Sequence, residues 1–445
     1  MIGIASRKKA GHDLAGAISW YGRVIALNTR PSFYFERAEC ERAAGDDGPA
    51  MADYLREAEL NPRQLLAYVG LGVVKARQGD FSGAIVAFDK ALELNPASFA
   101  ALYYRSVAEV QLGDLENALS DIADAVASNA SDPGAYIQRA LVKAAMHDKP
   151  GALEDYARAI GLDPGNCVAR LNRSEIEGDD ADYAACFADL DAAIKADPNW
   201  ATLYVRRGVR EAENLRQDDA IKDFDRALEL NPDLIEARTE RAWTKSTTSD
   251  RHGAFEDFIT AGRARWAAGD LDGALADLNR AVDMDPDAGE AHSARGLVEQ
   301  ALGQFEPALA DYDAATKGGS GPFAHLYRYL LLKRLGRPTD EDLADVMVNS
   351  DDGFFEEAGR YVTGQISLDD AASFAQHQTP LTVAQTDLTR LYYYSGVLLL
   401  SGGENAKARS HFAYCIWMKT KGCDEYEFAD SELARMDAQG GEPAH

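Results

Sequence analysis

Arginine and aspartate recur along this chain sixteen residues apart, the most regular spacing among its side chains that could do chemistry. A planar guanidinium group matches a carboxylate or a phosphate group through two parallel N–H donors. The series therefore has two interpretations: ion pairs that hold the fold together, or a ladder of arginines for an acidic or phosphorylated ligand. The pairs are Arg37/Asp53, Arg105/Asp121, Arg139/Asp155, Arg173/Asp189, Arg207/Asp223, Arg241/Asp257 and Arg295/Asp311.

Both partners are missing together at two places in the series. Leu71 and Ala87 stand where one pair is expected, and Ile4 and Trp20 replace the pair nearest the N-terminus. Ion pairing explains this joint loss, because a half-buried charge without its partner is costly. The joint loss therefore favours the structural interpretation over the ligand ladder.

Side chains that commonly catalyse reactions or bind metals are present but not grouped. The eight histidines include no HExxH motif, and the five cysteines include no C-x-x-C motif. The glycine-rich stretch 318–321 lacks the lysine and hydroxyl residue of a phosphate-binding loop and indicates a linker. No serine lies in a G-x-S-x-G motif. We therefore expect no catalytic residue, no metal site and no cofactor, and a protein that is not an enzyme.

The elements that carry these side chains are marked by alanine at a spacing of 34 residues. A bulky apolar side chain follows each alanine four residues later, as Phe88 follows Ala84. A fixed period of this length is typical of a solenoid, in which each unit packs only against its neighbours. The series comprises Ala50, Ala84, Ala118, Ala152, Ala220 and Ala254, with Cys186 at the remaining position.

Residues 65–98 show the plan of one unit. Apolar and small residues at helical spacing lead to a break at Gly79, and a second helix follows that Pro96 ends. The unit resembles the tetratricopeptide repeat family, on the pattern formed by Tyr68, Leu71, Gly72, Ala84, Phe88 and Pro96. The resemblance implies an all-α, right-handed superhelical solenoid of antiparallel helix hairpins that acts as an adaptor or scaffold. Complete units cover 31–64, 65–98, 99–132, 133–166, 167–200, 201–234 and 289–322.

The spacing of the alanines slips once. After Ala254 the next alanine in phase is Ala274, only 20 residues on, so one helix of fourteen residues is missing. Phe258 then belongs to the second helix of one unit and to the first helix of the next. We expect the segment 252–268 to serve both units and the stack to be kinked near 250–270.

These features predict a chain organised in five parts. The parts are an N-terminal repeat array at 1–250, a second repeat lobe at 251–322, a degenerate helical region at 323–388, a C-terminal repeat-like unit at 389–437 and a disordered tail at 438–445.

A ligand groove is expected on the concave face, which in this family is lined by the first helix of each unit. Positions facing that groove carry apolar and tyrosine side chains, flanked by acidic residues such as Glu36 and Glu175. An apolar floor with acidic rims suits an amphipathic or extended peptide with basic flanks. The alternative is that these side chains pack between neighbouring first helices or against the chain's own tail. The predicted peptide-binding residues are Val69, Val73, Tyr103, Tyr104, Val107, Ile137 and Leu141, with Asn172 and Arg206 as polar anchors.

Charge and hydropathy narrow the class of partner. The formal net charge of −27 disfavours nucleic acid and anionic membrane surfaces, and no stretch is long and apolar enough to insert into a membrane. We therefore expect protein or peptide partners. The N-terminus lacks the pattern of a signal peptide, which predicts a cytoplasmic protein. A disulfide between Cys415 and Cys423 would require export, and buried free thiols are favoured.

About the last 120 residues resemble the C-terminal part of NlpI-type lipoproteins of bacterial envelopes. The resemblance rests on the stretches YVTGQISLDDA, LYYYSGVLLLSGGENAKARSHFAYC and EYEFADSELARM. Those proteins are tetratricopeptide repeat adaptors that dock peptidoglycan hydrolases and a protease. The resemblance implies an alternative function, as an envelope-associated module that presents or regulates a hydrolase or protease, and a periplasmic location if the true start lies upstream. It also makes the region from Tyr392 to Tyr394 a second candidate contact surface.

Overall fold

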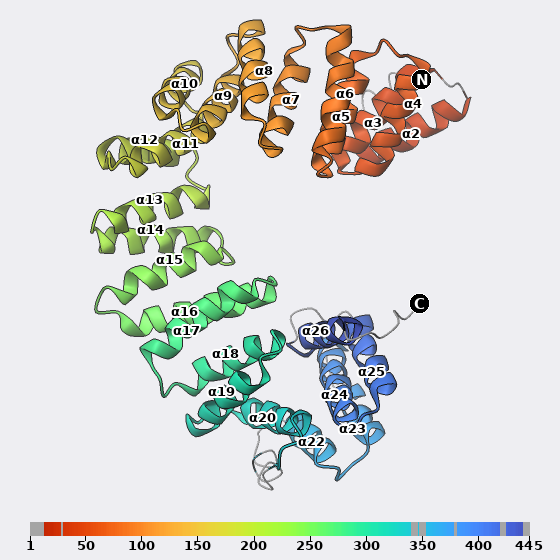
Figure 1. Ribbon diagram of the computed structural model, residues 1–445, viewed down its shortest axis with the longest axis vertical. Coiled ribbons are helices and arrows are strands. Elements are labelled where there is room, and N and C mark those ends of the chain that lie inside the picture. Colours follow the sequence, from red (N-terminus) through yellow and green to blue (C-terminus); the bar gives the residue numbers. More distant parts are fainter. Residues whose placement is uncertain are drawn as a thin grey trace. The chain divides into compact units, whose positions relative to one another are not determined.

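The structure is a computed structural model, and all regular secondary structure in its described residues is helical (Figure 1). The chain divides into two compact units, Met1–Leu203 and Tyr204–His445. The all-α class predicted from the sequence is confirmed, whereas the predicted five-part division stays a prediction. The described residues are 13–27, 30–339, 346, 353–377, 381–418 and 424–438.

Helices of the first unit pack as hairpins that follow one another along the chain (Figure 1). The hairpins are α3/α4, α5/α6, α7/α8, α9/α10 and α11/α12, and α2 packs on α3. The bounds are α2 Leu14–Leu27, α3 Pro31–Ala44, α4 Asp47–Leu60, α5 Leu65–Arg77, α6 Phe81–Leu94, α7 Phe99–Gln111, α8 Leu115–Ser128, α9 Pro133–Ala145, α10 Lys149–Leu162, α11 Cys167–Asp179 and α12 Tyr183–Ala196.

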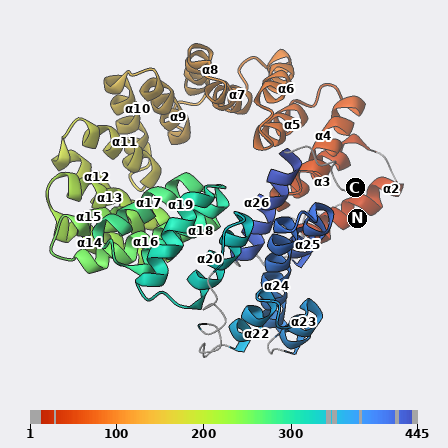
Figure 2. The ribbon, with the colours of Figure 1, turned by 60° about the horizontal axis from the view of Figure 1, so that its bottom comes forward.

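The second unit continues this plan and ends in a group of helices that pack on one another, with α20 against α24 and α24 against α25 and α26 (Figure 2). Its helices are α13 Ala201–Glu213, α14 Gln217–Leu230, α15 Ile235–Ser246, α16 Arg251–Ala267, α17 Leu271–Met284, α18 Gly289–Ala301, α19 Phe305–Lys317, α20 Pro322–Arg334, α22 Gly353–Val362, α23 Leu368–Gln376, α24 Leu381–Ser401, α25 Asn405–Met418 and α26 Asp424–Ala438. In the described part of the chain, no helix is long and apolar enough to cross a membrane.

Small residues let the two helices of a hairpin approach closely. A Cβ atom added at Gly72 of α5 would lie 2.4 Å from Cε1 of Phe88 on α6. Phe88 is fully buried beside Ala84 and Ala91. Since a dense core leaves no room for an extra methyl group, the spacing of small and aromatic residues seen in the sequence determines how the hairpin packs.

The arginines and aspartates spaced sixteen residues apart form bidentate ion pairs within hairpins. Nε of Arg37 donates to Oδ2 of Asp53 at 2.5 Å, and Nη2 donates to Oδ1 at 2.7 Å. Leu71 and Ala87, which replace one pair, are buried in the same core cluster. The structural interpretation is therefore confirmed for Arg37/Asp53, Arg105/Asp121, Arg139/Asp155, Arg173/Asp189, Arg207/Asp223, Arg241/Asp257 and Arg295/Asp311.

Some of these arginines also join one hairpin to the hairpin before it. Nη1 of Arg105 donates to Oδ1 of Asp89 on α6 at 2.6 Å. Nη1 of Arg241 makes the equivalent bond to Asp225 at 2.6 Å, and Nη1 of Arg295 bonds Asn279 at 2.9 Å. One planar side chain thus fixes both the closure of its own hairpin and the spacing to its neighbour.

Helix α16 serves two hairpins, as expected for the segment 252–268. It packs with similar extent against α15 and α17, and Phe258 is buried between them. Ala261 stands where the pairing arginine is expected, and Arg265, one turn later, bonds Asp277 of α17 at 2.9 Å instead. The predicted kink of the stack near 250–270 stays a prediction.

The turn between the two helices of most repeats contains a residue in the left-handed conformation. Gly45, Gly79 and Gly113 occupy this position in the first unit with φ between 80° and 87°. This conformation is unfavourable for L-residues because Cβ approaches the following carbonyl oxygen. Three repeats nevertheless place side chains there: His147 at φ 63°, Ala181 at φ 59° and Leu215 at φ 59°.

The predictions about Cys415, Cys423 and the C-terminal tail fall only partly on described residues. Cys415 is a buried free thiol, and burial raises the pKa of this thiol, which keeps it protonated. Cys423 and the predicted tail from residue 439 onward lie outside the described residues.

A double-mutant cycle tests the ion pair of the α3/α4 hairpin. Arg37→Leu leaves Asp53 as a buried charge, so we expect it to cost about 3 kcal/mol. Adding Asp53→Ala should recover most of that loss, since repeat 65–98 uses leucine and alanine naturally. Hydrogen exchange of α3 and α4 is the measurement, because repeat arrays unfold in several steps.

The matched comparison for this cycle is Arg139→Leu. Nζ of Lys143 lies 2.7 Å from Oδ2 of Asp155, so that aspartate keeps a cation when Arg139 is removed. Arg139→Leu should therefore cost less than Arg37→Leu. Additive losses in the Arg37/Asp53 cycle would show that the pair is not energetically coupled.

Replacing the left-handed leucine provides a second test of the fold. Leu215 is 80% exposed, so Leu215→Gly removes backbone strain without loss of core packing. We expect a gain of about 1 kcal/mol in the free energy of unfolding, measured by denaturant titration. Leu112→Gly is the control: Leu112 is also exposed but has φ −91°, so glycine should cost about 1 kcal/mol there. A loss of stability in Leu215→Gly would contradict the assigned strain.

Candidate functional site

The apolar residues of the predicted groove lie on α5, α7 and α9, three consecutive first helices that contact one another. Tyr104 exposes 40% of its surface and Leu141 exposes 41%. Val69 exposes only 7% and belongs to the core between the helices. The solvent-facing part of the groove is therefore centred on Tyr104 and Leu141.

The two tyrosines of α7 are held by other aromatic rings. Tyr103 and Tyr104 meet edge to face with centroids 5.3 Å apart. Tyr103 stacks on Phe99 at 5.9 Å, and Tyr104 stacks on Phe88 of α6 at 6.3 Å. Burial raises the pKa of the Tyr103 phenol, so its hydroxyl group stays protonated and able to donate. Rigid aromatic rings of this kind offer contact area at little entropic cost.

Other predicted residues are only partly accessible. Val73, Tyr103 and Ile137 pack against the core with one side, and Val107 is half-buried. The alternative of packing between first helices thus applies to Val69 and in part to these neighbours. The accessible apolar surface is narrower than the set of predicted residues, and its role in peptide binding stays a prediction.

The two predicted polar anchors belong to different compact units. Asn172 is half-buried on α11 of the first unit. Arg206 is on α13 in the second unit, where its Nη1 lies 2.9 Å from Oε1 of Glu236. A ligand carboxylate at Arg206 would therefore compete with a carboxylate of the chain itself.

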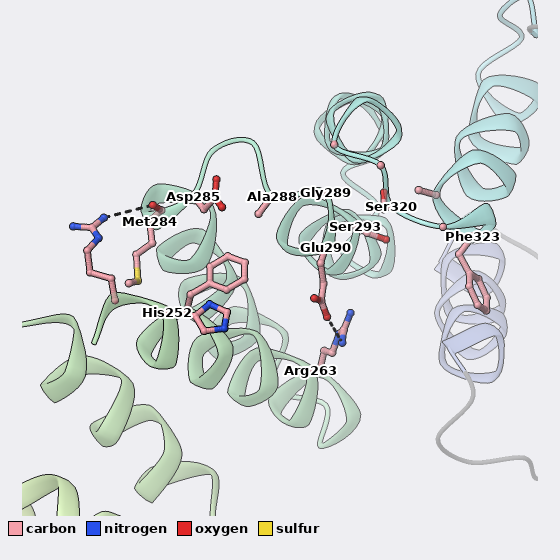
Figure 3. A pocket seen from close by; sticks show the side chains of 16 residues that line it. His252, Arg263, Met284, Asp285, Ala288, Gly289, Glu290, Ser293, Ser320 and Phe323 are labelled. Atoms are coloured by element: carbon pink, nitrogen blue, oxygen red, sulfur yellow. Dashed lines mark hydrogen bonds and ion pairs between the residues drawn. The ribbon is translucent and has the colours of Figure 1, made fainter. Parts of the chain in front are cut away.

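The second unit contains a pocket that the sequence did not reveal (Figure 3). Its volume is about 770 Å³, and it lies among the first turns of α16, α18 and α20. Phe255, Met284 and Phe323 supply apolar lining. Arg263 and Glu290 form an ion pair of 2.9 Å at its edge, drawn as a dashed line in Figure 3.

The glycine-rich stretch 318–321, expected to be a linker, forms one wall of this pocket as the turn from α19 to α20. Gly289 approaches this turn so closely that an added Cβ atom would lie 3.1 Å from the carbonyl oxygen of Gly318. The interrupted alanine spacing and the glycine-rich stretch were the only features of the sequence that coincide with this pocket. The folded structure is needed to show that they lie side by side. Within the described residues, no group of three or more His, Cys, Asp or Glu side chains is placed to hold a metal ion.

Farther along the second unit, the first helices are covered by the chain's own last helix. Glu425 of α26 accepts hydrogen bonds from the hydroxyl groups of Tyr327 at 2.6 Å and Tyr394 at 2.7 Å. Phe428 contacts the ring of Trp266 at 5.6 Å, and Nη2 of Arg435 donates to the carbonyl oxygen of Gln300 at 3.0 Å. Helix α26 thus packs against residues of α16, α18 and α20.

The prediction of a second contact surface from Tyr392 to Tyr394 is largely wrong. Tyr393 and Tyr394 are fully buried, because α26 packs over them. Only Tyr392 is partly exposed, where it contacts Tyr414 at 4.3 Å. The sequence did not show that the last helix would cover these rings.

Comparisons with known proteins identify the repeats. The family model for the tetratricopeptide repeat matches residues 69–136 and 259–331. No curated protein sequence matches the chain. The NlpI-type resemblance stays a prediction.

Solved structures that resemble this chain include a tetratricopeptide repeat protein from Parabacteroides merdae, with 18% identity, a TM-score of 0.43 and coverage of 60% of this chain and 98% of that one. Another is pilF of Pseudomonas aeruginosa, with 17% identity, a TM-score of 0.42 and coverage of 48% and 97%. A third is YrrB, described as a TPR protein with an unusual peptide-binding site, with 20% identity, a TM-score of 0.34 and coverage of 41% and 95%.

The hairpins with their small and aromatic packing residues agree with the two stretches that the family model matches. The chain contains tetratricopeptide repeats, and the regular secondary structure of its described residues is all helical.

Proposed function

We propose that this protein is a non-enzymatic scaffold that binds a protein or peptide segment along α5, α7 and α9. The observation that carries the proposal is the exposure of Tyr104 and Leu141 on neighbouring first helices, beside the half-buried Tyr103 and Val107. Large apolar side chains in a row at the surface favour an interaction site over solvent contact. Tyrosine is also a common anchor of binding energy.

The charge of the chain defines the complementary ligand. The net charge of −27 raises the local concentration of cationic segments, and it repels acidic ones. The ligand that fits is a peptide or helix with apolar anchors for Tyr104 and Leu141 and with basic residues beside them. Asn172 of α11 lies in the next repeat along the first unit and can bond a ligand backbone.

The double substitution Tyr103→Ala with Tyr104→Ala tests this function. Crosslinking mass spectrometry of the full-length protein in its native extract first identifies a bound segment, which is then synthesised. We expect the double variant to bind that peptide about 30-fold more weakly, a loss of about 2 kcal/mol, in a fluorescence anisotropy titration. Circular dichroism should remain close to that of the unmodified protein.

Tyr183→Ala is the matched control, since Tyr183 is a half-buried tyrosine on the second helix α12, stacked on Phe187 at 6.2 Å. It should leave peptide affinity unchanged. Leu141→Ser tests the same groove with both tyrosines intact, should the double variant unfold. Unchanged affinity in the folded groove variants, or crosslinks confined to other helices, would refute the proposed site.

A further inference from the structure

Glutamate occupies the eleventh position of several repeats, one helical turn beyond the paired arginine. Four of these side chains are buried, exposing between 5% and 8% of their surface, and Glu177 is half-buried. The Oε2 atom of each is buried without a hydrogen-bond partner among the described residues. A buried carboxylate oxygen without a donor is costly when it is charged. The five residues are Glu41, Glu109, Glu177, Glu211 and Glu299.

Glu109 on α7 shows why its charge is poorly compensated. Asp121 faces it from α8, Asp114 from the turn and Asp89 from α6. Its cationic neighbour is Arg105, whose Nε lies 3.9 Å from Oε1 of Glu109. Arg105 already donates to Asp121 and to Asp89. Asp121, Asp89 and Glu109 thus share a single guanidinium group, and Asp114 adds a further negative charge beside Glu109.

The other four glutamates face aspartates in the same way. Their charged neighbours are Asp53, Asp46 and Arg37 for Glu41; Asp189, Asp182 and Arg173 for Glu177; Asp223, Asp219, Arg207 and Arg216 for Glu211; and Asp311 and Arg295 for Glu299.

Other repeats place a cation at this same position. There the side chain bonds the aspartate at the twenty-third position. Lys143 and Lys245 share that aspartate with a paired arginine, whereas Arg265 bonds it in place of the missing arginine. The contacts are Lys143 to Asp155 at 2.7 Å, Lys245 to Asp257 at 3.1 Å and Arg265 to Asp277 at 2.9 Å. The array therefore contains two electrostatic types of hairpin built on one backbone plan.

Burial, and then the charge of Asp121, raise the pKa of Glu109 to about 7, although Arg105 opposes the shift. Burial likewise raises the pKa of Glu41, Glu177, Glu211 and Glu299 to about 7. Two facing carboxyl groups with one shared cation do not both ionise readily.

We propose that these glutamates make the array a proton-responsive scaffold, in which glutamate-bearing hairpins are tight when the carboxyl group is neutral and loosen when it ionises. The lysine- and arginine-bearing hairpins do not respond, because their eleventh residue keeps its charge and its partner.

The direction of the response follows from the raised pKa. A carboxyl group with an ordinary pKa of 4.5 in the unfolded chain and about 7 in the hairpin binds its proton more tightly when folded. Its stabilising effect is complete below the unfolded value and is lost as pH rises through about 7. Between pH 6 and pH 8, the equilibrium constant for opening of the hairpin should increase about tenfold.

The response reaches the groove because α7 carries Glu109 together with Tyr103 and Tyr104. Loosening of α7 would disturb the stacking of Tyr104 on Phe88 of α6. This consequence rests on the proposed function, whereas the proton response itself is measured without a ligand, so the two can fail separately.

Hydrogen exchange mass spectrometry of the full-length protein at pH 6 and pH 8, corrected for the intrinsic exchange rate, tests the proposal. In the unmodified chain, protection of α7 and α8 should fall about tenfold at the higher pH, and that of α9 and α10, which contain Lys143, should change much less. Glu109→Gln should abolish the fall in α7 and α8. Asp124→Asn, an exposed carboxylate on α8, is the control and should keep it.

If protection from exchange fell equally in the α7/α8 and α9/α10 hairpins between pH 6 and pH 8, the proposal would be overturned, because the loss would then be a general effect of charge. The proposal would also be overturned if protection of α7 and α8 in Glu109→Gln fell as much as in the unmodified chain. If that variant does not fold, the comparison between the two hairpin types in the unmodified chain decides the matter.

Discussion

The ion pair between the seventh and twenty-third residues of a repeat is the interaction on which the rest of this structure depends. Its bidentate geometry fixes how far the two helices of a hairpin slide along each other, as in Arg37 and Asp53. The third donor of Arg105 or Arg241 reaches the preceding hairpin. Because each pair is half-buried, losing one partner is more harmful than losing both, as Leu71 and Ala87 illustrate.

The arginine–aspartate pair determines which faces of a first helix are free to vary in sequence. With the hairpin closed by Arg105 and Asp121, α7 presents Tyr104 outward and directs Glu109 toward the pair. The outward row is available for a ligand, whereas the inward position tunes the electrostatics of the hairpin. Helix α7 therefore carries the proposed binding surface on one face and, on another, Glu109, whose pKa is raised to about 7 by burial.

The second unit shows how the packing adapts when the repeat plan is interrupted. Helix α16 replaces two helices, so Arg265 substitutes one turn later for the missing arginine and bonds Asp277. The pocket lies beside the first turn of this shared helix. Beyond it, Glu425 and Phe428 of α26 pack against Tyr327 of α20. The substituted ion pair and the pocket thus occur where the repeat period is interrupted.

The sequence alone determined the helical hairpins, the paired arginines and aspartates and the shared role of 252–268, because local spacing and joint loss report directly on contacts within a repeat. It also located the apolar row on α5, α7 and α9, but it could not show that Val69 is buried while Tyr104 is exposed. Tertiary structure decided that difference, together with the burial of Tyr393 and Tyr394 beneath α26 and the pocket at 318–321. These features depend on which helices meet across long separations in the chain, and no local period encodes such contacts.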